Sequence, residues 1–367
     1  MKLFYLLNTI YNSGGMERVL TLKANYLSRV YGYEIVIVTT HQKGRPSFFP
    51  IDGSIRHIDL DVNINLPFMM PRYVRRLNRL MEAERPDIVI SLCYKDLLYL
   101  HKIKGECIKM AEFHFSHDTY RIKGQLRKMH RMEKAVAGLD CFVVLTQEDR
   151  QVWEPFCPHL EQIYNPSTFP VDGPLAPLEA KRFISGGRFE KQKNYQDMVR
   201  VWELVHHRHP DWVLDLYGCG KHKASVARLL KRLGLEDVIR LHPATGQMQQ
   251  EMLGASGYLM TSLYEGFPMV LVECAAVGLP AVAWRCPCGP GEFIEDGKDG
   301  MTTEPGDIEG MAERICRLIE DEALRKKMGG LLREKAPNFS LERIMPQWDA
   351  LFRRLVSTSS PTSPSQD

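Results

Sequence analysis

The sequence predicts an α/β protein built from two Rossmann-like domains, each with a parallel sheet covered by helices on both faces. Three observations predict this fold class. Short apolar runs alternate with longer segments of helical periodicity, the alternation breaks once at a proline-rich segment and then restarts, and 367 residues suffice for two domains of medium size. Because consecutive parallel strands are joined by crossover helices, this rhythm indicates parallel sheets.

Six apolar runs in the first half predict buried strands separated by helical patterns. Helices are expected over residues 16–30 and 72–84. The strands are expected over residues 3–8, 34–40, 55–60, 87–91, 107–112 and 141–145. These elements define a first domain over residues 1–164, followed by a proline-rich linker over residues 165–181.

The same alternation restarts after the linker and defines a second domain over residues 182–340. Strands are expected over residues 182–185, 212–217, 238–241, 257–261 and 281–284, and helices over residues 195–207, 223–233, 268–277 and 307–335. A helical pattern over residues 341–356, with Ile344, Trp348 and Leu351 on one side, predicts a helix that returns to the first domain. The tail, residues 357–367, has no apolar content and predicts disorder.

Composition excludes several function classes. A net charge of +3 gives no bulk signal for nucleic-acid binding. Nine cysteines, an odd and dispersed set, are typical of reduced thiols in a cytoplasmic protein. The apolar start of the chain is too short for a signal peptide, and no apolar stretch reaches the length of a membrane span. We therefore expect a cytoplasmic protein, with peripheral attachment to the inner face of the plasma membrane left open.

Two carboxylates eight residues apart, Glu265 and Glu273, form the strongest chemical signal. Pro268 suits the first turn of a helix, so Glu265 precedes that helix and Glu273 lies within it among apolar residues. A carboxylate in an apolar helix needs polar partners, and a ribose diol would provide two donors. The alternative is that Glu273 meets a core arginine and Glu265 is solvated.

A glycine-rich basic loop, residues 186–194, follows the first strand of the second domain. Its glycines let the backbone approach a ligand, and Arg188 and Lys193 supply positive charge where a diphosphate would lie. The alternative is a basic loop that only faces solvent.

Two features of the first domain are weaker. Gly14 and Gly15 follow the first strand without forming a dinucleotide fingerprint, and they could be a plain tight turn. His114 follows another strand, where it could contact a sugar or have only a structural role.

Together these segments resemble the family 4 retaining glycosyltransferases of the GT-B fold, whose two Rossmann-like domains face a central cleft. The resemblance spans nearly the whole chain. It rests on Gly14-Gly15, His114, Ile163-Tyr164-Asn165-Pro166, Gly187-Arg188, Lys193, Tyr217-Gly218-Cys219-Gly220, the segment from Glu265 to Glu273, and residues 286–292 and 296–300.

The resemblance implies roles for these residues. Arg188 and Lys193 would neutralise the departing diphosphate, Glu265 would bind hydroxyls of the transferred sugar, and Glu273 would hold the ribose. His114 would contact the sugar near the reacting carbon, which makes His114, Arg188, Lys193 and Glu265 the catalytic candidates. The donor-binding set is completed by Gly15, Gly187, Gly218, Gly266, Phe267, Pro268, Met269, Val270 and Glu273.

No cofactor and no metal are expected. Asp59-Leu60-Asp61 resembles the metal-binding signature of another transferase fold, but it closes a strand pattern and is interpreted as a strand end. His206, His207 and His209 are interpreted as a solvated helix end before a proline.

Two basic segments of the first domain bear on the partners. Arg72, Arg75, Arg76 and Arg79 share a helical pattern and are interpreted as solvated. A second group contains Arg121, Lys123, Arg127, Lys128, Arg131 and Lys134, for which contact with anionic lipid or a lipid diphosphate is an open alternative.

The resemblance thus implies a retaining glycosyltransferase that moves a hexose or N-acetylhexosamine from a nucleotide sugar, UDP-linked by analogy, to a glycan or lipid-linked acceptor in cell-surface polysaccharide synthesis. A nucleotide-sugar epimerase or hydrolase of the same fold and a non-catalytic nucleotide-sugar-binding subunit remain alternatives.

Overall fold

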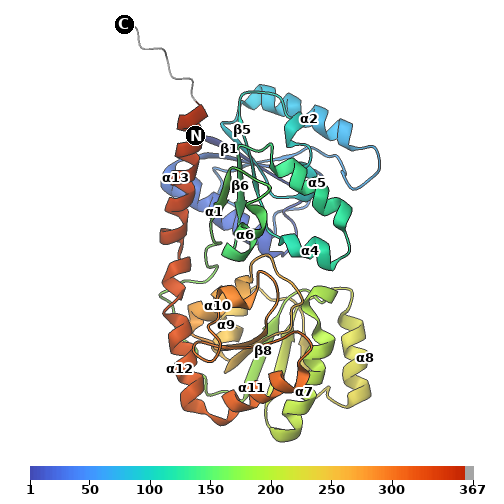
Figure 1. The fold of residues 1–367 in the computed structure, drawn as a ribbon, viewed down its shortest axis with the longest axis vertical. Coiled ribbons are helices and arrows are strands. Elements are labelled where there is room, and N and C mark those ends of the chain that lie inside the picture. The colour runs from blue at the N-terminus through green and yellow to red at the C-terminus, as the bar shows by residue number, and fades with distance from the viewer. Residues whose placement is uncertain (360–367) are drawn as a thin grey trace. The chain divides into compact units, whose positions relative to one another are not determined.

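The computed structural model of the chain describes residues 1–359, which divide into two compact units. One unit comprises Met1–Thr168 together with the helix that begins at Leu341, and the other comprises Phe169–Ser340 (Figure 1). Each unit contains one parallel sheet with helices on both faces, so the predicted fold class of two Rossmann-like α/β domains is confirmed.

The first sheet has seven parallel strands in the order β3-β2-β1-β4-β5-β6-β7. Its strands are β1 (Lys2–Leu7), β2 (Glu34–Thr39), β3 (Arg56–Asp59), β4 (Ile88–Ser91), β5 (Ile108–Glu112), β6 (Cys141–Val144) and β7 (Leu160–Gln162). The helices of this unit are α1 (Gly15–Tyr31), α2 (Met70–Glu84), α3 (Tyr94–Leu97), η1 (Leu100–Lys102), α4 (His117–Ile122), α5 (Leu126–Val136), α6 (Gln147–Trp153) and α13 (Leu341–Ser359).

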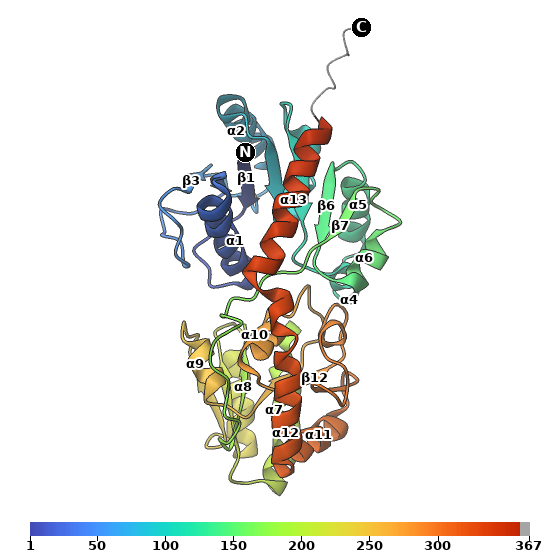
Figure 2. The same ribbon diagram turned by 90° about the vertical axis from the view of Figure 1, so that its left-hand side faces the viewer.

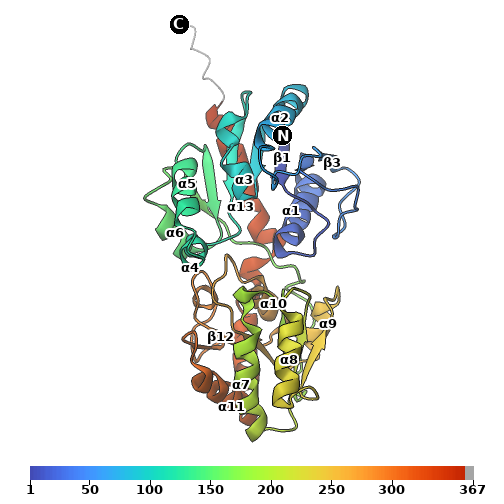
Figure 3. The same cartoon turned by 90° about the vertical axis from the view of Figure 1, so that its right-hand side faces the viewer.

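Two apolar layers cover the faces of this sheet. On one face, α1 and α13 pack together and bury Tyr5, Leu27 and Trp348 (Figure 2). On the other face, α2, α3 and α5 bury Tyr73 and Met132 (Figure 3). Because both faces are covered, the strands are apolar along their whole length rather than alternating, as expected of a parallel sheet.

The second sheet has six parallel strands in the order β10-β9-β8-β11-β12-β13. Its strands are β8 (Arg182–Gly186), β9 (Val213–Tyr217), β10 (Ile239–His242), β11 (Gly257–Met260), β12 (Ala281–Trp284) and β13 (Met301–Thr303). The helices are η2 (Lys191–Lys193), α7 (Tyr195–Arg208), α8 (Lys223–Leu233), α9 (Met248–Leu253), α10 (Met269–Val277), η3 (Pro290–Glu292), α11 (Ile308–Glu320), α12 (Glu322–Arg333) and η4 (Ala336–Phe339).

Two sequence-based boundaries are wrong. The expected helix over residues 307–335 is two helices, because Asp321 leaves the helical conformation and its side chain accepts the Leu324 N–H at 2.8 Å to cap α12. The predicted disordered tail over residues 357–367 begins too early, since α13 runs to Ser359; the remainder of that prediction lies outside the described residues. The short strands β7 and β13 were not expected.

Candidate active site

The order of strands reverses at β8, which pairs with β9 on one side and with β11 on the other. Ligands of parallel α/β sheets bind at the carboxyl ends of the strands beside such a reversal. The loops after β8 and β11 lie at this place, and hydrogen bonds join them. The Thr261 hydroxyl donates to the Lys193 carbonyl at 2.9 Å, and the Leu263 N–H donates to the Gln192 carbonyl at 2.8 Å.

These two loops bring Lys193 and Glu265 together. The Lys193 Nζ lies 2.7 Å from Oε1 of Glu265, and their side chains are 22% and 8% exposed. Gln192 Nε2 donates to the other oxygen, Oε2, at 3.2 Å, so both carboxylate oxygens have donors. Glu265 is therefore a held, buried carboxylate, and the alternative that it is solvated does not apply.

The loop after β8 also crosses closely over the loop after β9. The Gly187 N–H donates to the Tyr217 carbonyl at 3.0 Å, and the Phe189 N–H donates to the Cys219 carbonyl at 2.8 Å. A Cβ added at Gly218, which has a φ of +150°, would lie 1.9 Å from the Gly187 carbonyl oxygen. Glycine at this position is thus required by a backbone crossing, which in turn sets the path of the basic loop.

Arg188 lies in the same loop, and its side chain is exposed. Among residues 1–359, its guanidinium takes part in no ion pair. It therefore remains available to a phosphate, for which a guanidinium offers two parallel donors.

Helix α10 begins after Pro268 and buries nearly all of its residues. Glu273 is 7% exposed on this otherwise apolar helix. The Phe267 ring packs edge-on against Phe293 with centroids 5.0 Å apart, so its side chain belongs to the core of the unit. Gly266, Met269 and Val270 are half-buried around the start of the helix.

The glycines after β1 have ordinary backbone angles. Gly14, the N-cap of α1, has a φ of −77° and a ψ of 160°, and a Cβ there would lie 2.3 Å from Oε2 of Glu17. A Cβ on Gly15 would meet no atom of the described residues within 4 Å. The two glycines therefore differ in the space beside them and not in their backbone conformation, and only Gly15 has open space beside it.

His114 lies beside a buried ion pair that the sequence analysis did not identify. Lys23 on α1 places its Nζ 2.7 Å from both carboxylate oxygens of Glu112, the last residue of β5. His114 Nε2 lies 3.2 Å from Oε1 of the same carboxylate. The signal was available, because Lys23 lies between Leu20 and Leu27 on the apolar side of its helix.

Electrostatics keeps this carboxylate ionised. Burial favours the neutral acid, but the ammonium of Lys23 and the His114 imidazole outweigh it and lower the pKa of Glu112 to about 2. Burial lowers the pKa of Lys23, an effect that Glu112 opposes. The geometry, with an ammonium centred on two oxygens, favours the charged pair.

Two family models match consecutive parts of the chain. The model described as Glycosyltransferase Family 4 matches residues 13–166, and the model described as Glycosyl transferases group 1 matches residues 172–334. The chain is a family 4 glycosyltransferase of the GT-B fold.

Relatives of full length support this assignment. The glycosyltransferase is 27% identical to an uncharacterized glycosyltransferase of Haemophilus influenzae, over 95% of this chain and 99% of that one. It is 26% identical to the amylovoran biosynthesis glycosyltransferase AmsD of Erwinia amylovora, over 96% of this chain and 99% of that one. Among solved structures, TarM of S. aureus, crystallised with UDP and alpha-GlcNAc-glycerol, matches with a TM-score of 0.82 at 16% identity, over 96% of this chain and 99% of that one. At that identity, the likeness shows the fold alone.

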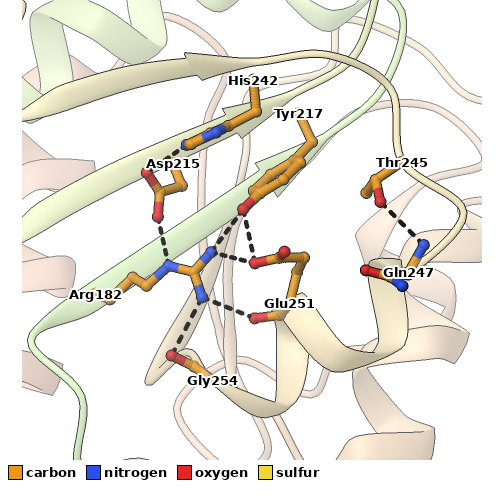
Figure 4. Close-up of polar contacts among 8 residues, drawn as sticks. All are labelled: Arg182, Asp215, Tyr217, His242, Thr245, Gln247, Glu251 and Gly254. Carbon is orange, nitrogen blue, oxygen red and sulfur yellow. Dashed lines mark hydrogen bonds and ion pairs between the residues drawn. The ribbon is translucent and has the colours of Figure 1, made fainter.

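The glycosyltransferase also has a polar cluster centred on Arg182, the first residue of β8 (Figure 4). Arg182 donates to the Glu251 carboxylate at 2.7 Å, to the Tyr217 hydroxyl at 2.9 Å and to Asp215. His242 Nε2 lies 2.8 Å from Asp215, and its ring stacks on Tyr217 with centroids 4.4 Å apart. These contacts join β8, β9, β10 and α9, so we interpret the cluster as a clamp that holds the strand ends in place.

The two metal-like motifs have structural partners. Asp59 ends β3, where its carboxylate accepts the Thr39 hydroxyl at 3.0 Å and the Gln42 N–H at 2.9 Å. His209 follows the end of α7 and lies 3.0 Å from Glu320. Across residues 1–359, no group of three or more His, Cys, Asp or Glu side chains could hold a metal ion.

The basic helix α2 borders a groove of about 1140 Å³ on the first unit. Arg72, Arg75 and Arg79 are exposed as expected, but Arg76 is half-buried and donates to the carbonyls of Leu60 and Asp61, so its expected solvation is wrong. Leu77 is buried, and Val74 and Leu80 pack against the core. The groove lining includes Arg75, Arg79, Arg85, Lys102 and Lys104 together with the apolar Met70, Val74, Met81, Pro86 and Tyr99.

The second basic group lies on α4 and α5 beside exposed apolar side chains. Phe115, Ile122 and Leu126 are 41%, 45% and 49% exposed. Arg121 is paired with Asp118 at 2.8 Å, so part of this charge is neutralised within α4. Within the described part of the chain, no helix has the length and apolar character needed to cross a membrane.

Proposed function

We propose that the glycosyltransferase transfers a hexose or N-acetylhexosamine from a UDP-linked donor, with retention of anomeric configuration, to a glycan or lipid-linked acceptor in cell-surface polysaccharide synthesis. The observation that carries the proposal is the contact between Lys193 and Glu265 at the strand reversal of the second sheet. UDP accompanies TarM in its crystal structure, and AmsD is named for polysaccharide biosynthesis.

The proposed chemistry assigns a different task to each charge. The bond from the sugar to the diphosphate breaks, the acceptor hydroxyl oxygen forms the new bond on the same face, and the hydroxyl proton passes to the departing diphosphate. Arg188 and Lys193 stabilise the negative charge that grows on the leaving diphosphate. Glu265, held by Lys193 and Gln192, accepts hydrogen bonds from sugar hydroxyls.

The remaining assignments concern the nucleotide and the acceptor side. Glu273, buried on α10, accepts hydrogen bonds from the ribose hydroxyls. Gly187 and Gly218 allow close backbone approach to the donor. In the first unit, Gly15 leaves space for a ligand, and His114 contacts the sugar near the reacting carbon.

A panel of nucleotide sugars, with and without lipid-linked acceptors, tests the proposal. The expected result is nucleotide release that requires an acceptor and that persists after treatment with a chelator, because no metal is assigned a role. Free sugar or an epimerised nucleotide sugar without acceptor would instead indicate a hydrolase or an epimerase. If no nucleotide sugar raises the melting temperature, the protein does not bind a nucleotide-sugar donor and the proposed function is wrong.

We also propose that the enzyme works at the cytoplasmic face of a membrane, with α4 and α5 against anionic lipid. Exposed Ile122 and Leu126 beside a basic group support this, because apolar insertion and charge attraction add in surface-bound helices. In a flotation assay with phosphatidylglycerol vesicles, the double variant Ile122→Ser with Leu126→Ser should no longer float with the vesicles. The matched control Leu204→Ser, which removes a 37% exposed leucine from α7, should float like the parent. Equal flotation of both variants would contradict the proposal.

A further inference from the structure

A contribution to stability does not by itself explain why Lys23 and Glu112 form a buried ion pair. Both side chains are 1% exposed, and their atoms lie 2.7 Å apart. Such pairs contribute little net stability, because the desolvation of two charges offsets their attraction. The C-terminal helix completes the enclosure, since the Lys23 Nζ lies 3.4 Å from the centroid of the Trp348 ring.

Strand geometry directs this charge toward His114. Successive side chains of an extended chain point to opposite faces, so Glu112 and His114 share one face while Phe113 takes the other. The Phe113 ring is fixed there, with Trp153 at 5.6 Å and Phe142 at 5.9 Å between centroids. Packing of Phe113 on the far face therefore holds His114 over the carboxylate, at 3.2 Å from Oε1.

The consequence for His114 is a fixed proton position. A carboxylate held ionised by an ammonium accepts a hydrogen bond from the nearer ring nitrogen, so the proton of a neutral imidazole is placed on Nε2. Nδ1 is then the nitrogen left to accept a hydrogen bond.

We propose that Glu112 is a positioning residue for His114 in sugar transfer, and that Lys23, covered by Trp348, holds Glu112 in its charged state. The inference rests on the proposed function for the role of His114 in transfer. The structural part of the inference does not rest on the proposed function, because the orientation of the His114 ring and the position of its proton can be measured without any substrate. The charged groups around the ring include Glu112 from β5 and Lys23 from α1, with the buried Tyr5 hydroxyl of β1 near the same carboxylate.

The first test measures the His114 ring by NMR of imidazole nitrogens, with the signal assigned from a His114→Gln variant. Glu112→Gln alone would leave a buried unpaired ammonium and could prevent folding. The double variant Lys23→Met with Glu112→Gln removes both charges together and keeps similar shapes. In it, the preference for the Nε2 proton should be lost. An unchanged tautomer would overturn the proposal, whatever the substrate.

The second test measures transfer. In the double variant, kcat should fall by about tenfold or more while KM for the donor stays within about threefold, because a misplaced His114 weakens a contact near the reacting carbon that matters most in the transition state. In a His114→Ala background, the double variant should have no further effect on kcat. Losses that add to those of His114→Ala would show a merely structural pair and refute the positioning role. If the parent enzyme turns over no nucleotide sugar, the proposed function fails, and the NMR test still decides the structural part.

Discussion

Replacing Lys193 with alanine removes a cation from the loop after β8 and leaves Glu265 without its 2.7 Å partner. Two effects follow. Glu265 is 8% exposed, so an incompletely paired carboxylate should cost about 1–3 kcal/mol of unfolding free energy. That cost should lower the melting temperature by about 2–12 °C in a unit of this size. Gln192 still donates to Glu265, which limits the loss.

The catalytic effect should be the larger one. Removing a group aimed at charge that develops in the transition state costs about 3–4 kcal/mol, which corresponds to about a 100- to 1000-fold fall in kcat/KM. Continuous detection of nucleotide release measures this value, and differential scanning fluorimetry measures the stability. The matched control is Lys191→Ala, which removes an exposed lysine from the same loop.

The comparison with Lys191→Ala decides the outcome. Lys191→Ala removes the same net charge from this loop, and it should change kcat/KM by no more than about threefold. If Lys193→Ala retains the kcat/KM of Lys191→Ala while its melting temperature falls, Lys193 only supports Glu265. The assignment of a diphosphate to this loop would then be wrong.

Three further predictions follow from other contacts. Gly218→Ala should sharply reduce donor-induced thermal stabilisation, because its Cβ would overlap the Gly187 carbonyl and displace the basic loop. An unchanged donor-induced shift of the melting temperature would contradict the requirement for glycine where these two loops cross. Arg182→Leu should lower the free energy of unfolding, measured by urea titration, by about 3–5 kcal/mol. Lys181→Ala, which breaks an exposed ion pair, should lower it by less than about 1 kcal/mol. Because the folded-state pKa of Glu112 is lowered, its stabilisation should be present above about pH 4.5 and lost as the pH falls toward about 2. Urea titrations at several pH values should show that the free energy of unfolding depends less on pH in the variant Lys23→Met with Glu112→Gln.

Much of the fold could be predicted because local patterns decide it. Apolar runs such as residues 34–40 cannot be exposed, and their regular spacing leaves little choice but parallel strands joined by helices. The break between α11 and α12 could not be predicted from periodicity, because both helices keep an apolar face and one residue, Asp321, changes direction between them. The strand β7 is short and half-buried, so its pattern is weak.

The chemical residues show the same division. The sequence alone placed Lys193 and Glu265 on loops after strands, because glycine and proline mark those loops regardless of the rest of the fold. It could not show that their side chains meet, since that requires β8 and β11 to be neighbours in the sheet. The requirement for glycine at residue 218 likewise arises from a second loop, which no local pattern contains.

The buried pair beside His114 is the clearest case that only tertiary structure decided. The sequence analysis named His114 from its place after a strand, but it did not identify Lys23, although Lys23 lies on the apolar side of α1. Lys23 and Glu112 are 89 residues apart in the chain, and Trp348 lies far beyond both. Local physics fixes which segments become strands and helices, but burial of a charge is settled by which distant groups the packing brings against it.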